Sequence, residues 1–306
     1  MLFRHTSIKY TLLFLILILL VLFPKICISG ATRGLLLWFN TVLPTLFPFF
    51  LVTRLILSLN LIPRSLSGFY PVMTGLIAGY PTGAATISEL IKAGQININQ
   101  GQLLMIISNN ASPGFLIGIA GCICSSVPSG QYYIWFSTIL SSAVITLLFS
   151  TKYLKKHSGS LDTQNITINE INKPEKNNTA FLSTLEDTMF ECFRLLVLIG
   201  GYIIIFSIVA DFSSLVVSGF LPHSIIAGIF EITTGITMIA SDTTGLPVII
   251  KGTAAAALCG FGGVSALLQT SGVIRDSGLS LSKYTLHKLL CGAAGGTIFY
   301  ILYSFR

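Results

Sequence analysis

Apolar runs recur along this chain, and they constrain its fold more than any other feature. A helix needs about 20 apolar residues to cross roughly 30 Å of hydrocarbon. Inside a bilayer every backbone polar group needs an internal partner, so such runs form helices. The sequence therefore predicts an all-α polytopic membrane protein with about 8–9 hydrophobic segments, some of them broken helices or re-entrant hairpins. The runs lie near residues 8–28, 35–60, 69–92, 100–124, 131–154, 188–210, 222–242, 246–272 and 285–304.

Composition supports a membrane protein and argues against nucleic acid as a partner. Of 306 residues 53% are hydrophobic and only 9% are charged, and the mean hydropathy is +0.82. Such values lie far outside those of soluble domains. The net charge of +7 comes from basic residues spread among loops without an aromatic-basic patch. Loop Lys and Arg in a membrane protein mostly set its orientation.

The first apolar run, TLLFLILILLVLF, follows Arg4 and Lys9 and has two interpretations. A basic start and a short apolar stretch are typical of a secretory signal peptide. No small-x-small cleavage site follows, however, and the next segment is again apolar. We therefore expect residues 1–33 to hold an uncleaved N-terminal transmembrane helix.

One long polar stretch divides the rest of the chain. Residues 155–180 are rich in Asn, Lys and Ser and too polar for burial, so we predict a linker loop there. Its lysines favour a cytoplasmic position. The linker separates a first membrane half, residues 34–154, from a second, residues 181–306.

The two halves share short matches at one spacing. GLIAGYPTGAATI (75–87) aligns with AGIFEITTGITMI (227–239), an offset of 152 residues, and SNNASPGF (108–115) aligns with FGGVSALL (261–268) at nearly the same offset. Each match lies at a polar interruption of an apolar run. Internal repeats with broken helices at a central site are typical of secondary transporters, so we predict two related halves.

The interruption GYPTG combines two glycines with a proline, so the helix is expected to open there. Freed N–H groups at the start of the next half-helix favour an anion. A packing kink without a ligand is the alternative. Adjacent amides in NNASP and the isolated Glu231 point to the same central place, since an intramembrane carboxylate is costly unless paired, protonated or hydrated. The predicted substrate-binding residues are Gly79, Tyr80, Pro81, Thr82, Gly83, Asn109, Asn110, Ser112, Pro113, Glu231, Thr233, Gly235, Gly262, Gly263, Ser265 and Gln269.

No pattern points to a metal site, a cofactor or an enzyme. Most of the six cysteines lie inside apolar runs, with no His or carboxylate at ligand spacing, so they read as small packing residues. No nucleophile elbow, phosphate loop or zinc signature occurs. We expect no metal, no cofactor and no enzymatic activity.

The segments LWFNTVLPTLFPFFLVT, GLIAGYPTGAATISEL, NNASPGF, FEITTG and FGGVSALLQTSG resemble, in order and context, those of the YlbJ-type sporulation integral membrane proteins, within the wider group that has nucleoside-recognition gate domains. The resemblance covers about residues 34–300. It implies two gate-like halves in a bacterial cell membrane. It also implies a role in moving dipicolinic acid across the outer forespore membrane during endospore formation.

Two classes of function remain open on the sequence. The first is transport of a small anionic metabolite, most of all dipicolinic acid, with a coupling proton or cation; a nucleoside-type permease is a variant of it. The second is a non-transporting sporulation scaffold or assembly factor in which the helix breaks serve packing alone. The isolated Glu231 favours transport, because a scaffold gains nothing from a buried carboxylate. The expected partners are the lipid bilayer and the substrate; the oligomeric state is open.

Overall fold

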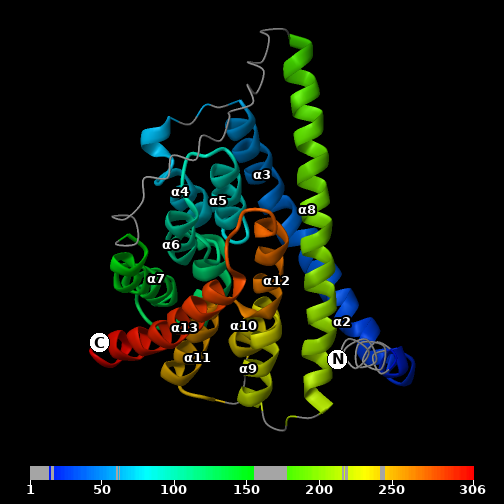
Figure 1. Cartoon of the computed structure of the whole chain (residues 1–306). Helices are drawn as coiled ribbons and strands as arrows, with labels where there is room; N and C mark the ends of the chain where they lie inside the picture. Colours follow the sequence, from blue (N-terminus) through cyan, green and yellow to red (C-terminus); the bar gives the residue numbers. More distant parts are fainter. Residues whose placement is uncertain are drawn as a thin grey trace, which may run out of the picture.

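The computed structural model describes residues 14, 17–59, 61, 63–154, 178–215, 217, 220–241 and 245–306, and every regular element among them is a helix (Figure 1). The first half contains α2 (Pro24–Leu37), η1 (Trp38–Val42), α3 (Leu43–Ser58), η2 (Arg64–Leu66), α4 (Tyr70–Ala78), α5 (Thr82–Lys92), α6 (Ile98–Ser108), η3 (Gly114–Ile119), η4 (Ala120–Cys124) and α7 (Gln131–Leu154). The second contains α8 (Asn178–Phe212), η6 (Ser213–Leu215), α9 (Phe220–Phe230), α10 (Ile232–Ala240), α11 (Val248–Phe261), α12 (Gly263–Ile274) and α13 (Leu281–Ser304).

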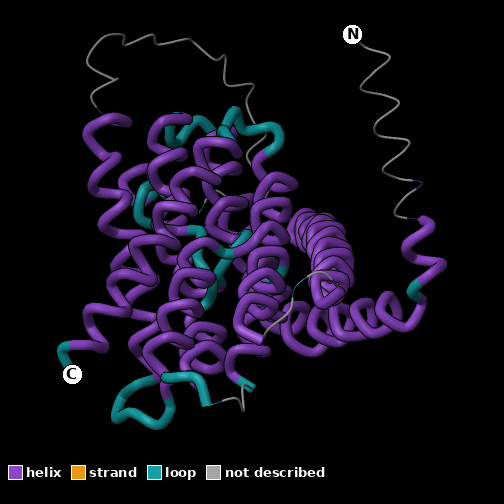
Figure 2. Tube along the Cα trace, turned by 90° about the horizontal axis from the view of Figure 1, so that it is seen from below, coloured by secondary structure: helices purple, strands orange, loops and turns teal. Residues whose placement is uncertain are grey.

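Helices α2, α3 and α8 form one structural unit, which we call the arm. Its longest helix, α8, has 35 residues and is therefore about 52 Å long at 1.5 Å per residue. Small residues let α2 approach α8 closely, since a Cβ atom added at Gly30 would lie 2.7 Å from the Ile208 Cα atom. Ion pairs from Arg33 to Asp211 and from Arg54 to Glu191 tie α2 and α3 to α8. In both views α2 extends away from the rest of the molecule (Figures 1 and 2).

Helices α4–α7 and α9–α13 form a second unit, which we call the bundle. In each half of the chain it begins with a helical hairpin, α4–α5 or α9–α10. Glycines allow the two helices of each hairpin to touch: a Cβ atom at Gly75 would lie 3.0 Å from the Gly83 Cα atom, and one at Gly235 would lie 2.3 Å from the Gly228 Cα atom. Because the turns are tight, each hairpin ends in a short tip, at residues 79–81 and at residue 231.

An interrupted helical segment follows each hairpin. Helix α6 ends at Ser108, and helical structure resumes at Gly114; helix α11 ends at Phe261 and α12 begins at Gly263. The second break turns at Gly262, whose φ of +90° is a left-handed conformation that favours glycine. A long helix, α7 or α13, completes each half. The order of elements in the bundle is thus the same in both halves, while their origin by duplication stays a prediction.

Four described helices are long and apolar enough to cross a membrane, or up to five if the pair Pro24–Val42 and Leu46–Ile56, bent by 52°, counts as one span. The hairpins and α6 are shorter than a bilayer is thick, so they add no full-length span of their own. The predicted 8–9 segments and the domain boundaries stay predictions. The beginning of the 1–33 segment and most of the 155–180 linker lie outside the described residues.

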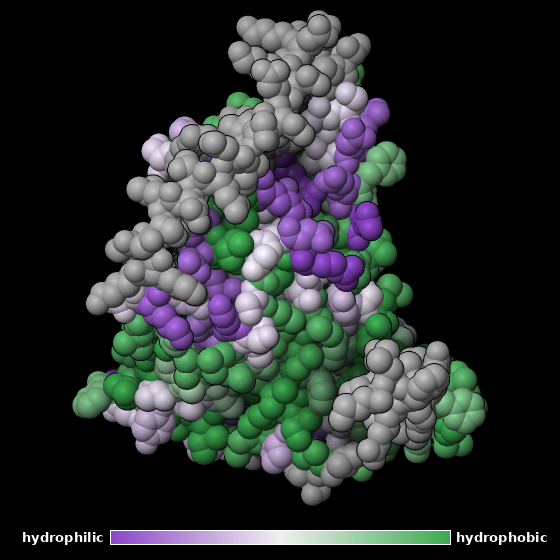
Figure 3. Space-filling view, in the orientation of Figure 1, coloured by the Kyte–Doolittle hydropathy of each residue, from purple (hydrophilic) through white to green (hydrophobic). Residues whose placement is uncertain are grey.

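The surface is that of a membrane protein. Large apolar side chains are widely exposed, among them Leu147, Phe190 and Val197. Figure 3 shows hydrophobic residues over most of the lower part of one face, and hydrophilic residues gathered higher up beside α8. A soluble protein would not leave so much contiguous apolar surface in water. The chain is an integral membrane protein.

Candidate functional site

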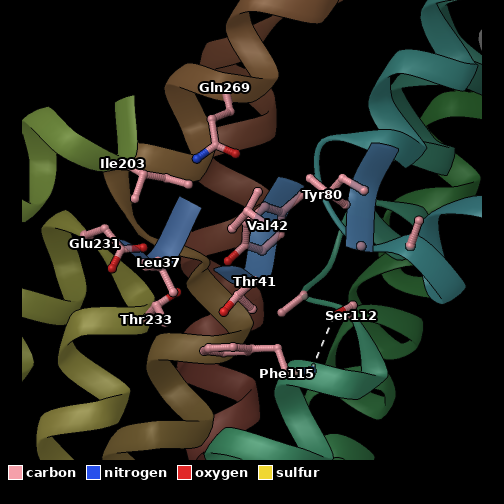
Figure 4. A pocket seen from close by; sticks show the side chains of 14 residues that line it. Leu37, Thr41, Val42, Tyr80, Ser112, Phe115, Ile203, Glu231, Thr233 and Gln269 are labelled. Atoms are coloured by element: carbon pink, nitrogen blue, oxygen red, sulfur yellow. Dashed lines mark hydrogen bonds between the residues drawn. The ribbon is translucent and has the colours of Figure 1, made fainter. Parts of the chain in front are cut away.

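A small pocket lies in the seam between the arm and the bundle, where both hairpin tips and the first helix break meet. Its volume is about 90 Å³, room for about three water molecules at ~30 Å³ each. Figure 4 shows Glu231 and Thr233 on one side and Tyr80 and Ser112 on the other. The lining residues are Leu37, Thr41, Val42, Leu46, Ala78, Gly79, Tyr80, Ala111, Ser112, Phe115, Ile203, Glu231, Thr233 and Gln269.

The first hairpin tip is held by a backbone hydrogen bond from the neighbouring break. Gly79 has a φ of +84°, which ends α4 without the steric cost that a side chain would add. The next N–H group, that of Tyr80, donates to the Asn110 carbonyl oxygen at 2.7 Å. Pro81 is the N-cap of α5 and is buried behind the tip. This connection places the half-buried Tyr80 beside the pocket.

The second tip consists of Glu231, which is the N-cap of α10. Its side chain is directed to its own helix: Oε2 accepts the Thr234 N–H at 2.7 Å, and only 3% of the residue is exposed. A carboxylate at a helix N-terminus satisfies a free N–H group and interacts favourably with the helix dipole. Capping therefore partly offsets the free-energy cost of burying this carboxylate. The sequence-based prediction considered pairing, protonation and hydration, but not capping.

Two further predicted residues reach the pocket through polar groups. The Ser112 hydroxyl lies at the start of η3 and accepts the Phe115 N–H at 3.4 Å (Figure 4). Gln269, on α12, donates from Nε2 to the Ser265 hydroxyl at 3.1 Å. With Tyr80 at the first tip and Glu231 and Thr233 at the second, the pocket therefore has hydroxyl, amide and carboxyl groups from four separate parts of the bundle.

Asn109 points away from the pocket into the bundle. Its Nδ2 donates to the Thr270 hydroxyl at 2.9 Å and to the Tyr284 hydroxyl at 2.7 Å, and all three residues are buried. Its neighbour Asn110 also faces inward: its Oδ1 accepts from the Ser142 hydroxyl at 2.9 Å. Both amides connect the first break to other helices. They do not line the pocket.

Eight other predicted residues do not line the pocket. They lie in the contacts and helix ends that surround it. Thr82, Gly83, Gly235, Gly262, Gly263 and Ser265 are buried in hairpin or helix contacts, and Pro81 and Pro113 are N-caps of the helices that follow the breaks. The structure thus brings Gly79, Tyr80, Ser112, Glu231, Thr233 and Gln269 together around one pocket.

The arm also contributes to the pocket, which no sequence pattern predicts. Leu37, Thr41 and Val42, at the junction of α2 and η1, and Leu46 and Ile203 line the pocket from the side opposite the bundle. Residues of these types are common in apolar runs, so the sequence does not indicate which of them line a pocket. Lys288, a buried lysine on α13, is not among the predicted residues either. It is a charged residue inside the apolar run LHKLLCGAAGG, as Glu231 is in its own run.

Two larger cavities lie along the same seam. The first, about 750 Å³, shares Leu37, Thr41 and Thr233 with the pocket and extends along α10 to Ser241. It includes Arg33, which pairs with Asp211 near the C-terminal end of α8. We call it the α10 vestibule.

The second cavity, about 690 Å³, lies toward the N-terminal half of α8 and is lined by charged residues of both units. We call it the charged vestibule. Its charged residues are Arg54, Glu89, Lys92, Glu191, Arg194, Arg275 and Asp276. The small pocket therefore lies between the α10 vestibule and the charged vestibule.

No group of three or more His, Cys, Asp or Glu side chains among the described residues is placed to hold a metal ion. All six cysteines are described, and each is a free thiol.

This chain is similar to the sporulation integral membrane protein YlbJ of Bacillus subtilis (strain 168). The two are 21% identical over 323 aligned residues, which cover 92% of this chain and 78% of that protein. No family model matches the chain, and no solved structure gives a significant match. The resemblance to YlbJ-type sporulation membrane proteins that the motifs predicted is therefore confirmed. The link to nucleoside-recognition gate domains stays a prediction.

Proposed function

We propose that this protein transports a small anionic metabolite, dipicolinic acid, across a membrane during endospore formation. One observation carries the proposal: a pocket with hydroxyl, amide and carboxyl groups, built from two hairpin tips and a helix break, lies between the α10 vestibule and the charged vestibule. Broken helices are tolerated at membrane depth where they line a cavity, and transporters bind substrate at such places. The similarity to a sporulation protein supplies the biological setting.

The size of the pocket suggests how transport proceeds. At about 90 Å³ it is smaller than the roughly 300–1,000 Å³ typical of ligand sites. Its walls come from both the arm and the bundle, so a shift of one unit against the other would widen it. Opening toward one vestibule and then toward the other gives alternating access around a fixed site.

An anion suits the ends of the helices at this site. Three helices begin at or just after lining residues: α5 follows Tyr80 and Pro81, η3 follows Ser112 and Pro113, and α10 follows Glu231. Helix N-termini carry partial positive charge, which favours carboxylates. An ionised Glu231 would repel a dicarboxylate, so substrate binding requires this side chain to be protonated or accompanied by a cation.

Uptake of radiolabelled dipicolinate into liposomes containing the purified full-length protein tests the proposal. We expect saturable uptake above that of empty liposomes, reduced by unlabelled dipicolinate and unaffected by nucleosides. Uptake of a labelled nucleoside without uptake of dipicolinate would indicate a nucleoside permease. Uptake of neither compound would favour a scaffold. If the host forms spores, deletion of the gene should give spores low in dipicolinate while synthesis in the mother cell continues.

A further inference from the structure

Lys288 is a buried cation behind the first hairpin tip. Only 1% of the residue is exposed, and it is one of the largest fully buried side chains of the described part of the chain. Its Nζ donates to the Asn110 Oδ1 atom at 2.8 Å. None of the three ion pairs among the described residues includes it. Lysine is almost never fully buried without a partner charge, so a purely structural role leaves its cost unexplained.

The position of this side chain is one that favours a cation. Asn110 follows the C-terminal end of α6, and Gly262 caps the C-terminal end of α11. A Cβ atom added at Gly262 would lie 4.0 Å from Lys288 Cε and 3.9 Å from Tyr80 Cε1. Helix C-termini carry partial negative charge. In transporters with broken helices, such ends and the unwound carbonyls beside them bind the coupling Na⁺ or H⁺.

Lys288 is also linked to the pocket through one residue. The Asn110 side chain accepts from Lys288, while the Asn110 main-chain oxygen accepts the Tyr80 N–H at 2.7 Å. Tyr80 lines the pocket, and Lys288 does not. A change at Nζ can therefore move the first hairpin tip without direct contact with the substrate. Lys288 is a positioning residue in this arrangement.

The surroundings of Lys288 are otherwise neutral. Ser142 on α7 donates to the same Asn110 oxygen. The titratable groups that interact electrostatically with Lys288 are the thiols of Cys259 on α11 and Cys291 on α13. The Tyr80 ring lies across Gly262 from Lys288 Cε, and Tyr284 lies one helical turn before Lys288 on α13. No carboxylate is among these groups. The positive charge at this place therefore depends on whether Nζ itself carries its proton.

We propose that Lys288 is a tethered coupling cation, which takes the place of a free Na⁺ ion and carries one proton with each substrate molecule. The ammonium form holds Asn110 and the first hairpin tip in the arrangement described above and adds a positive charge behind an anionic substrate. After the substrate leaves, the shift of the arm against the bundle admits water to Nζ, and one proton passes from Nζ to that water while the electron pair stays on nitrogen. The neutral amine is protonated again on the loading side. The coupling half of this inference depends on the proposed transport function.

Two variants separate the cation site from the coupling. Lys288→Ala leaves a space beside Asn110 Oδ1, so its melting temperature should rise with methylammonium chloride or sodium chloride in a saturable manner, unlike that of the wild-type protein. Lys288→Met keeps the length and the packing of the side chain but carries no proton. Lys283→Ala and Lys283→Met are matched controls, because Lys283 is exposed on the same helix.

In liposomes, an inward proton gradient at saturating dipicolinate should accelerate uptake by the wild-type and Lys283→Met proteins. It should have no effect on Lys288→Met, whose rate should fall about tenfold, the usual effect of losing a charge-assisted hydrogen bond.

An unchanged response of Lys288→Met to the gradient overturns the coupling role. Absence of cation-dependent stabilisation in folded Lys288→Ala overturns the cation site. Should Lys288→Ala fail to fold, the response of Lys288→Met decides. If the wild-type protein shows no uptake while Lys288→Ala gains stabilisation, the transport function and the coupling role fail and the cation site stands.

Discussion

Tyr80 and Glu231, one from each half of the chain, face the same pocket from the tips of two separate helical hairpins (Figure 4). Tyr80 is held there by a hydrogen bond to Asn110, and Glu231 by capping of α10. The two tips are fixed by different contacts, and the arm closes the space between them. A substrate at this site would therefore contact both halves of the bundle and the arm at once.

Replacement of Glu231 by glutamine should separate its capping role from its charge. The glutamine oxygen can still accept the Thr234 N–H, so we expect the melting temperature to stay close to that of the wild-type protein. Because ionised Glu231 repels a dicarboxylate, the KM of the wild-type protein for dipicolinate should rise with pH. In Glu231→Gln this rise should be absent. The measurement is KM against pH in liposomes with no proton gradient and equal amounts of inserted protein.

Two further variants serve as controls for that experiment. Glu231→Ala removes the cap and should cost about 1 kcal/mol of stability. Asn97→Ala removes the cap of α6, where Asn97 Oδ1 accepts the Gln100 N–H at 2.9 Å away from the pocket, and should cost a similar amount without changing KM. Coincident KM curves for the wild type and Glu231→Gln would leave Glu231 a capping residue only.

Gly235→Ala should destabilise the second hairpin. The new methyl group would lie 2.3 Å from the Gly228 Cα atom and 2.7 Å from the Ser224 oxygen, so α9 and α10 would have to separate. We expect a loss of about 1–3 kcal/mol, the range for overpacking, seen as a lower melting temperature in detergent. Gly201→Ala on α8 is the matched control, since nothing lies within 4 Å of its added Cβ atom. Equal melting temperatures for the two variants would contradict the described packing of this hairpin.

Asn109→Leu should affect stability and leave substrate affinity unchanged. Asn109 donates to Thr270 and Tyr284 inside the bundle, and leucine leaves these buried hydroxyls without that donor. The expected cost is about 1–3 kcal/mol, measured by thermal unfolding. Tyr284→Phe removes the bond from Asn109 Nδ2 and also the bond that the Tyr284 hydroxyl donates to the Asn109 main-chain oxygen at 3.2 Å, so it should cost a similar amount. A KM for dipicolinate that rises strongly in Asn109→Leu, with stability preserved, would return this residue to the binding site where the sequence placed it.

The positions of the helix breaks could be predicted from the sequence. The directions in which their side chains point could not. Gly79, Pro81 and Glu231 interrupt apolar runs, and polar or helix-breaking residues in such runs are strong local signals. Whether a polar side chain at a break turns toward the pocket, as Ser112 does, or into the bundle, as Asn109 does, depends on contacts with helices distant in sequence. No local pattern encodes those contacts.

The arm and the buried lysine were missed for two different reasons. Leu37 and Ile203 are ordinary apolar residues in membrane helices, and only the packing of α2 and α8 against the bundle places them at the pocket. Lys288 could have been recognised from the sequence, because it is a charged residue inside an apolar run. Basic residues near a helix end commonly extend to the membrane surface, whereas this one points inward to Asn110.

Thiol modification of Thr233→Cys tests the central claim, that substrate passes through the pocket between the arm and the bundle. Thr233 lines both the pocket and the α10 vestibule. The parent protein should lack the exposed Cys122 and the partly exposed Cys27, and the same parent without the new cysteine is the control. We predict that a small, charged thiol reagent abolishes dipicolinate uptake by Thr233→Cys and leaves the parent active, and that dipicolinate slows the modification. Complete modification of Cys at this position with uptake unchanged would contradict the account.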